Sequence, residues 1–229
     1  MLNLIGHYDS PFVRRVGVSL HLLGMPFERH LLSVFSNADA LRTYSPLGRV
    51  PVLVLDGGEC LADSAAILDH LDEIAGPERA LLPASGRARR DALQKIVFAT
   101  GISDKAVAIT YERRKAAGKV DESWIARCRS QQDGALAALE DRFAAEAPGN
   151  AGLMQAEVTV GTMLGYVRLR QPETLPPGRY PALEALSARA EDLPAFKACL
   201  PTLKEIGGPP DEASAALQRL RGCEPSEQA

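Results

Sequence analysis

The spacing of apolar residues changes close to residue 80. Before this point, short apolar runs typical of strands alternate with segments of helical periodicity, whereas beyond it helical periodicity dominates. The pattern predicts an α/β domain over residues 1–80, a linker over 81–86 and an all-helical domain over 87–205. We expect the remainder, 206–229, to be a partly flexible extension.

The first domain is expected to run βαβ and then ββα. Turn-forming residues set the ends of these elements: Gly24 and Pro26 follow the first helix, Asp56-Gly57-Gly58 joins a hairpin, and Gly76-Pro77 ends the last helix. The predicted elements are a strand at 2–7, a helix at 11–23, a strand at 27–34, a short helix opening at 37, strands at 52–55 and 59–61, and a helix at 64–74.

Glycine and proline also divide the second domain. Gly118, Pro148-Gly149 and Pro172 interrupt the helical pattern. The predicted helices span 87–117, 123–146, 155–170, 182–189 and 194–200, followed by one or two helical turns within 213–221.

The composition excludes several classes of function. A net charge of −3 gives no electrostatic footprint for nucleic acid, and no apolar run reaches the roughly 20 residues that cross a bilayer. The first residues lack the basic flank of a signal peptide. Four widely spaced cysteines suggest neither a zinc site nor a disulfide framework. We therefore expect a cytoplasmic protein with no metal, no nucleic-acid partner and no membrane partner.

Three motifs follow one another in the first domain. The segment 8–12 (Tyr-Asp-Ser-Pro-Phe) opens a helix, Val50-Pro51 precedes a strand, and Asp63-Ser64 opens another helix. Together they resemble the glutathione S-transferase family, and the Ser-Pro-Phe-Val-Arg-Arg context resembles its serine-type tau class. The resemblance implies a thioredoxin-like first domain, glutathione as co-substrate, a small hydrophobic electrophile, a role in detoxification and a homodimer.

Ser10 is the candidate catalytic residue. A free thiol has a pKa of about 8.5, and a hydroxyl donor at a helix N-terminus can stabilise its thiolate. A shift of about two pKa units needs about 2.7 kcal/mol, which one donor and a helix dipole can supply. The simpler interpretation is an N-cap serine. Tyr8 is a minor rival for the catalytic role, although packing explains it better.

The resemblance also assigns the glutathione site. It implies a cis bond at Val50-Pro51, which turns the backbone of Val50 toward the cysteinyl unit like an added strand. Ser64 would hold the γ-glutamyl carboxylate at a helix N-terminus, with Asp63 near the amine. Arg49 is a candidate for the glycyl carboxylate, and Phe12 belongs to the same set. Each residue also has a simpler interpretation. Asp63 and Ser64 can be a helix cap, Pro51 an ordinary proline on an edge strand, and Arg49 a solvated surface arginine.

The helical domain offers three further candidates. The resemblance implies that Asp104 reaches glutathione across the dimer, and a solvated helix charge is the alternative. Val107 and Tyr111 lie three and seven residues further on, so they share that helix face and are candidates for the electrophile pocket.

Two departures from the family pattern stand out. A lysine after the second strand, which helps to bind the glycyl carboxylate in many relatives, is replaced by the segment 35–37 (Phe-Ser-Asn), where Asn37 is a weak substitute. Met154 stands where relatives have a Ser or Thr cap, whose loss costs about 1 kcal/mol. Glu157 retains the acidic half of that capping box.

Two other functions stay open. A glutathione-dependent thioltransferase or reductase would favour cysteine at position 10. A non-catalytic glutathione-binding or protein-interaction module with the same fold is consistent with the missing lysine, but the retained Ser10 and Asp63-Ser64 argue against it.

Overall fold

The N-terminal part of the chain is organised around a four-stranded mixed sheet. The computed structural model describes residues 1–146 and 152–221, so the predicted Pro148-Gly149 turn, Cys223 and the end of the extension lie outside the described residues. The strand order is β2-β1-β3-β4, with β1 and β2 parallel and the other pairs antiparallel. The strands are β1 (Leu2–Ile5), β2 (Phe27–His30), β3 (Val52–Val54) and β4 (Cys60–Ala62).

Three helices complete the predicted βαβ and ββα order. They are α1 (Pro11–Leu22), α2 (Ala38–Arg42) and α3 (Ser64–Ala75). The predicted second strand is too long, because β2 ends at His30 and not at residue 34. The chain turns instead: the Asn37 N–H donates to the Ser33 carbonyl at 3.0 Å, and the Asn37 Oδ1 accepts from the Ser33 N–H at 3.1 Å.

A helical part follows the sheet, as predicted. Its helices are α4 (Gly86–Glu112), α5 (Glu122–Ala144), α6 (Gln155–Arg170), α7 (Pro181–Asp192) and α8 (Pro194–Ala198), with a short 3₁₀ turn at Pro172–Thr174. The predicted first helix is five residues too long. It ends at Glu112 because the Glu112 carboxylate accepts hydrogen bonds from the Lys115 ammonium and the Asp121 N–H, which hold the turn into α5.

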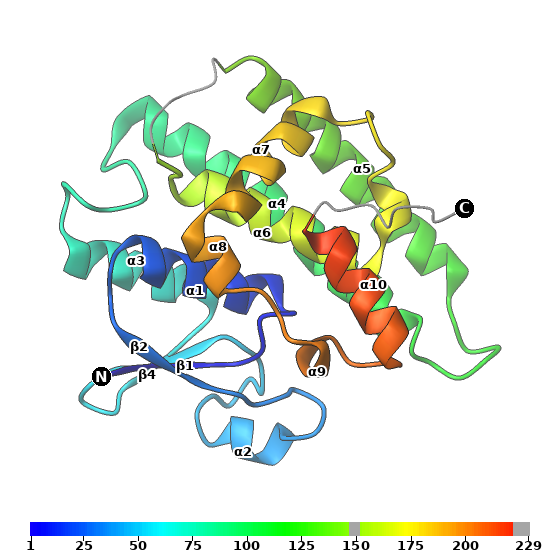
Figure 1. The fold of residues 1–229 in the computed structure, drawn as a ribbon, viewed down its shortest axis with the longest axis horizontal. Coiled ribbons are helices and arrows are strands. Elements are labelled where there is room, and N and C mark those ends of the chain that lie inside the picture. Colours follow the sequence, from blue (N-terminus) through cyan, green and yellow to red (C-terminus); the bar gives the residue numbers. More distant parts are fainter. Residues whose placement is uncertain (147–151, 222–229) are drawn as a thin grey trace.

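Two short helices follow, α9 (Leu203–Ile206) and α10 (Pro210–Leu220). The prediction of one or two turns within 213–221 underestimated α10, which packs against α6 (Figure 1). Ala213, Ala216 and Leu220 form a small buried cluster with Leu169 of α6. The sequence signal is weak because few large apolar residues mark this helix.

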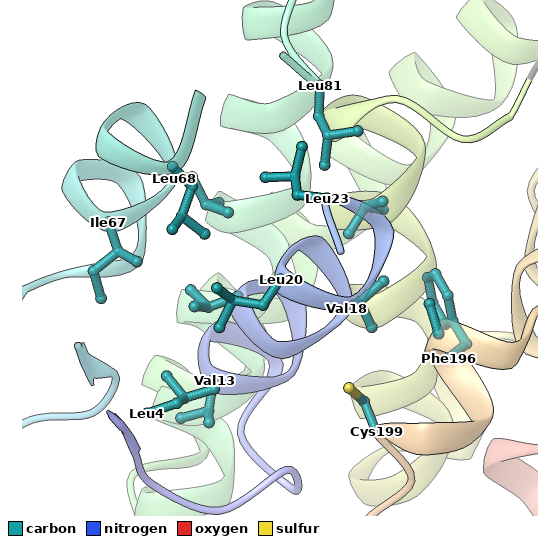
Figure 2. Packing of buried hydrophobic residues seen from close by; sticks show 14 of the residues in the cluster. Leu4, Val13, Val18, Leu20, Leu23, Ile67, Leu68, Leu81, Phe196 and Cys199 are labelled. Atoms are coloured by element: carbon teal, nitrogen blue, oxygen red, sulfur yellow. The ribbon is translucent and has the colours of Figure 1, made fainter. Parts of the chain in front are cut away.

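The main core surrounds α1. Leu4 of β1, Val13, Val18 and Leu20 of α1, and Ile67 of α3 are fully buried there. Figure 2 shows Phe196 and Cys199 approaching the other side of α1 from the α8 region, so this helix is covered by both parts of the chain.

A buried ion pair reinforces the contact between α1 and α7. Arg14 Nη1 and Nη2 donate to the two Glu191 carboxylate oxygens at 2.8 and 2.7 Å, and Arg14 Nε donates to the Cys199 carbonyl at 3.0 Å. Arg14 is 1% exposed and Glu191 is 8% exposed. Gly165 of α6 leaves room for this arginine, since a Cβ there would lie 2.6 Å from Arg14 Nη1.

The described residues contain no metal-binding group and no helix of the length and hydropathy that crosses a membrane. Cys60, Cys128 and Cys199 are free thiols, and only Cys60 is exposed.

Candidate functional site

Ser10 caps the N-terminus of α1. Its Oγ accepts a long 3.4 Å hydrogen bond from the Val13 N–H, and its backbone is extended, as an N-cap requires. Within the described part of the chain, its hydroxyl proton has no acceptor. The half-buried hydroxyl is therefore free to donate to an anion placed at the positive end of the helix.

Tyr8 belongs to the core, as the packing interpretation expected. It is 2% exposed, and the guanidinium carbon of Arg29 lies 3.5 Å from the centre of its ring. Burial raises the pKa of the Tyr8 hydroxyl strongly. A buried phenol without a hydrogen-bond partner among the described residues is poorly suited to activate a thiol from solvent.

The Val50-Pro51 peptide bond is cis, as the resemblance implied. Pro51 is buried and Val50 is half-buried at the start of β3. Arg49 is exposed beside them, and no described residue forms an ion pair or hydrogen bond with its side chain. It is thus a cation available to an incoming anion.

Asp63 and Ser64 form a strained helix start. Asp63 has φ 76°, the one described non-glycine residue with positive φ, and its carboxylate accepts the Ala65 N–H at 2.7 Å. Strain of this kind persists where surrounding structure enforces it, often at functional sites. Ser64 is 2% exposed, and its Oγ accepts a 2.7 Å hydrogen bond from Arg15 Nη2.

Arg15 is a site residue that sequence reasoning missed. It is 3% exposed, yet its Nε and Nη1 have no partner among the described residues. Burial lowers the pKa of Arg15 to about 10, and the charges of Asp63 and Asp104 oppose this. An arginine in the first turns of an amphipathic helix usually faces solvent, so no signal in this single sequence marked it as buried.

Asp104 lies within the electrostatic reach of this cluster in its own chain. Burial raises the pKa of Asp104, with Lys105, Arg49 and Arg15 opposing the shift and Asp63 adding to it. The site thus brings acidic and cationic groups together at the start of α3 and the middle of α4.

The end of α4 meets the loop that follows β2. The rings of Tyr111 and Phe35 pack edge to face with centroids 5.3 Å apart, and the Arg114 guanidinium lies 4.2 Å from the Phe35 ring centre. Tyr111 is 47% exposed and Phe35 is 56% exposed. Val107 instead packs against the helical core, so it does not share the exposure of Tyr111.

Two family models match this chain. The model described as Glutathione S-transferase, N-terminal domain matches residues 4–79, and the model described as Glutathione S-transferase, C-terminal domain matches residues 122–189. Among curated proteins, the chain is 29% identical over 177 residues to an uncharacterised GST-like protein, YibF, of Escherichia coli, covering 74% of this chain and 84% of that protein.

Solved structures of glutathione transferases are also similar to this chain. A glutathione S-transferase of Methylobacterium radiotolerans, in complex with glutathione sulfonate, is 30% identical with a TM-score of 0.80, covering 87% of this chain and 94% of that one. A glutathione transferase family member of Pseudomonas fluorescens with bound glutathione is 31% identical with a TM-score of 0.77, covering 88% of this chain and all of that one.

Proposed function

Since the chain belongs to the glutathione S-transferase family, we propose that it is a transferase in which the Ser10 hydroxyl activates the thiol of glutathione. The observation that carries the mechanism is the free hydroxyl proton at the N-terminus of α1. The Ser10 O–H donates to the thiolate sulfur, and the α1 dipole favours the same negative charge. The thiolate then attacks a small electrophile.

The reaction is a substitution when the electrophile is a chlorodinitrobenzene. The sulfur forms a bond to the ring carbon, the carbon–chlorine bond breaks, and chloride leaves with the electron pair. The thiol proton passes to solvent when the thiolate forms. Ser10 stabilises sulfur charge and neither gains nor loses a proton.

The γ-glutamyl unit is held at the start of α3. The Ser64 hydroxyl already accepts from Arg15, so its own proton is available to the γ-glutamyl carboxylate. The unpartnered Arg15 Nη1 supplies a charged donor beside it. Asp63 and Asp104 carry the negative charge that pairs with the γ-glutamyl amine.

The rest of the tripeptide extends along β3. The Val50 backbone pairs with the cysteinyl unit like an added strand, with Pro51 fixing the course of the chain and Phe12 alongside. Arg49, which has no described acidic partner, lies next to Val50 and receives the glycyl carboxylate. The electrophile binds toward the exposed ring of Tyr111. Val107 lines the inner side of that pocket.

The assembly we propose is a cytoplasmic homodimer. Leu93 and Val97 lie four residues apart on one face of α4 and are 39% and 58% exposed, and Ile74 of α3 is 51% exposed. Light scattering of the purified protein tests the dimer: a monomer mass for wild type contradicts it, and Val97→Glu is expected to convert a dimer to monomers.

Substitution of Ser10 tests the mechanism. A hydrogen bond to a charged group contributes about 1.5–3 kcal/mol, so Ser10→Ala should lower kcat/KM for conjugation roughly tenfold to a hundredfold. Ser10→Thr keeps a hydroxyl and should retain more activity than Ser10→Ala.

The cap role of Ser10 needs a separate readout. Losing an N-cap costs about 1 kcal/mol of stability without changing the thiol. We therefore expect the pKa of bound glutathione, followed by thiolate absorbance, to rise in Ser10→Ala. An unchanged thiol pKa together with lower stability would leave Ser10 as a cap and refute its catalytic role.

A further inference from the structure

The loop between β2 and α2, residues 31–37, contains no lysine or arginine. The structure nevertheless places a cation there, because Arg114 at the end of α4 lies over the ring of Phe35 at 4.2 Å. Phe35 and Tyr111 are in edge-to-face contact, which fixes this loop against α4. The helical domain thus supplies a charge that the loop itself lacks.

Arg114 differs from the cations on either side of it. Arg113 donates to Glu173 at 2.7 Å, and Lys115 donates to Glu112 at 2.7 Å. Arg114 is exposed, and no acidic side chain among residues 1–146 and 152–221 pairs with it. Stacking on an aromatic ring uses the face of a guanidinium and leaves its N–H edge free for an anion.

The loop that Arg114 contacts and the segment that carries Arg49 meet at one end of the sheet. Ile5 of β1 pairs both with His30, which precedes the loop, and with Val52 of β3. Val34 and Val50 pack against one hydrophobic cluster.

Burial raises the pKa of the Tyr111 hydroxyl and the charge of Asp9 adds to that shift, whereas the charges of Arg114 and Arg49 act against it. Neither arginine forms an ion pair within the described residues, so both charges are available to an anion bound at this end of the sheet.

We propose that Arg114 joins Arg49 in binding the glycyl carboxylate of glutathione, so that one end of the tripeptide is held by both domains. This inference rests on the proposed function, which runs glutathione from Ser64 past Val50 to Arg49. Arg114, at the end of α4, takes the place of the cation that the loop lacks.

The test compares two ligands that differ only at the glycyl end. Glutathione and its glycyl ethyl ester share the γ-glutamyl, thiol and backbone groups, but the ester lacks the negative charge of the glycyl carboxylate. We expect Arg114→Gln to weaken glutathione binding about twofold to fivefold in calorimetric titration at low salt, and to leave binding of the ester unchanged. Arg113→Gln is the matched control, because that arginine is engaged by Glu173, and it should change neither affinity.

A second variant restores the charge on the loop. Ser36 is exposed on the same loop, so Ser36→Lys in the Arg114→Gln background should recover glutathione affinity, and added salt should reduce the gain. Failure of this rescue, with a normal thermal midpoint, would contradict the assignment of the carboxylate to this position.

Other results would overturn the proposal in recognisable ways. Equal weakening of both ligands by Arg114→Gln would mean that the effect is not directed at the glycyl carboxylate. Unchanged glutathione affinity with slower turnover of a carboxylate-bearing electrophile would assign Arg114 to the electrophile. If wild type binds neither thiol ligand, the proposed function itself fails, whereas wild-type binding with an unaffected Arg114→Gln variant refutes this inference alone.

Discussion

Replacing Glu191 by alanine should destabilise the protein far more than any neighbouring surface change. The variant leaves the Arg14 guanidinium, 1% exposed, without the two carboxylate hydrogen bonds of 2.8 and 2.7 Å. Two carbonyl contacts remain, from Cys199 at 3.0 Å and Phe196 at 3.4 Å, and neither carries a countercharge.

The magnitude follows from the burial of this pair. Removing one partner of a buried ion pair costs about 3–5 kcal/mol, because the remaining charge is left uncompensated. The free energy of unfolding of a whole protein is on the order of 5–15 kcal/mol, so the loss expected for Glu191→Ala is a large fraction of the total stability. The double variant Arg14→Met with Glu191→Leu removes both charges and should recover most of the stability.

Urea unfolding followed by circular dichroism measures the effect. Asp192→Ala is the matched control, because its partner Lys197 is 58% exposed and Asp192 is 86% exposed. Such a surface pair contributes about 0–1 kcal/mol. A loss below about 1 kcal/mol in Glu191→Ala, or a double variant as unstable as the single one, would refute the reasoning.

Three further outcomes are expected. Tyr8→Phe removes a buried hydroxyl that has no described partner, so stability should be unchanged or higher by up to about 1 kcal/mol, and loss of conjugation activity would contradict the core role of Tyr8. Gly165→Ala should destabilise because its Cβ meets Arg14, whereas Gly134→Ala in the open interior of α5 should stabilise by about 0.5–1 kcal/mol, both measured by thermal unfolding. Burial raises the pKa of Glu205, but hydrogen bonds from the N–H groups of Thr202 and Tyr8 and from the Arg29 guanidinium outweigh it and hold that pKa below the usual value of a glutamate. The stability this gives is present above that usual value and is lost as the pH falls through the folded pKa, so Glu205→Gln should flatten the acid side of the stability curve; an unchanged curve would count against the linkage.

The sequence predicted the first domain well because strong turn signals bound its short elements. The helix over 155–170 was also predicted to the residue, since an acidic N3 position and a following glutamine and proline mark its ends. The Met154 side chain makes no cap hydrogen bond, while the Glu157 carboxylate accepts the Met154 N–H at 3.0 Å, as expected.

The errors arose where tertiary contacts override local pattern. Leu32 and Val34 continue an alternating pattern, so the second strand was drawn too long, whereas the backbone turns and Leu32 packs in a cluster with Ile5 and Val52. Arg15 was missed for a related reason: only the packing of α1 against other elements shows that this arginine is buried. The domain limits and the roles of the site residues stay predictions, and the binding and kinetic experiments above address the roles.

The hydrogen bond between the Tyr8 N–H and the Glu205 carboxylate has a consequence for synthesis of the chain on the ribosome. The Tyr8 N–H donates to Glu205 Oε1 at 2.9 Å across 197 residues of sequence, and it belongs to the segment that leads into Ser10. Domains usually fold as the chain emerges, N-terminal part first. Here the segment that carries Ser10, the proposed catalytic residue, obtains this contact only after nearly the whole polypeptide has been made. The newly made N-terminal part of the chain therefore lacks this hydrogen bond until the segment around Glu205 has emerged from the ribosome.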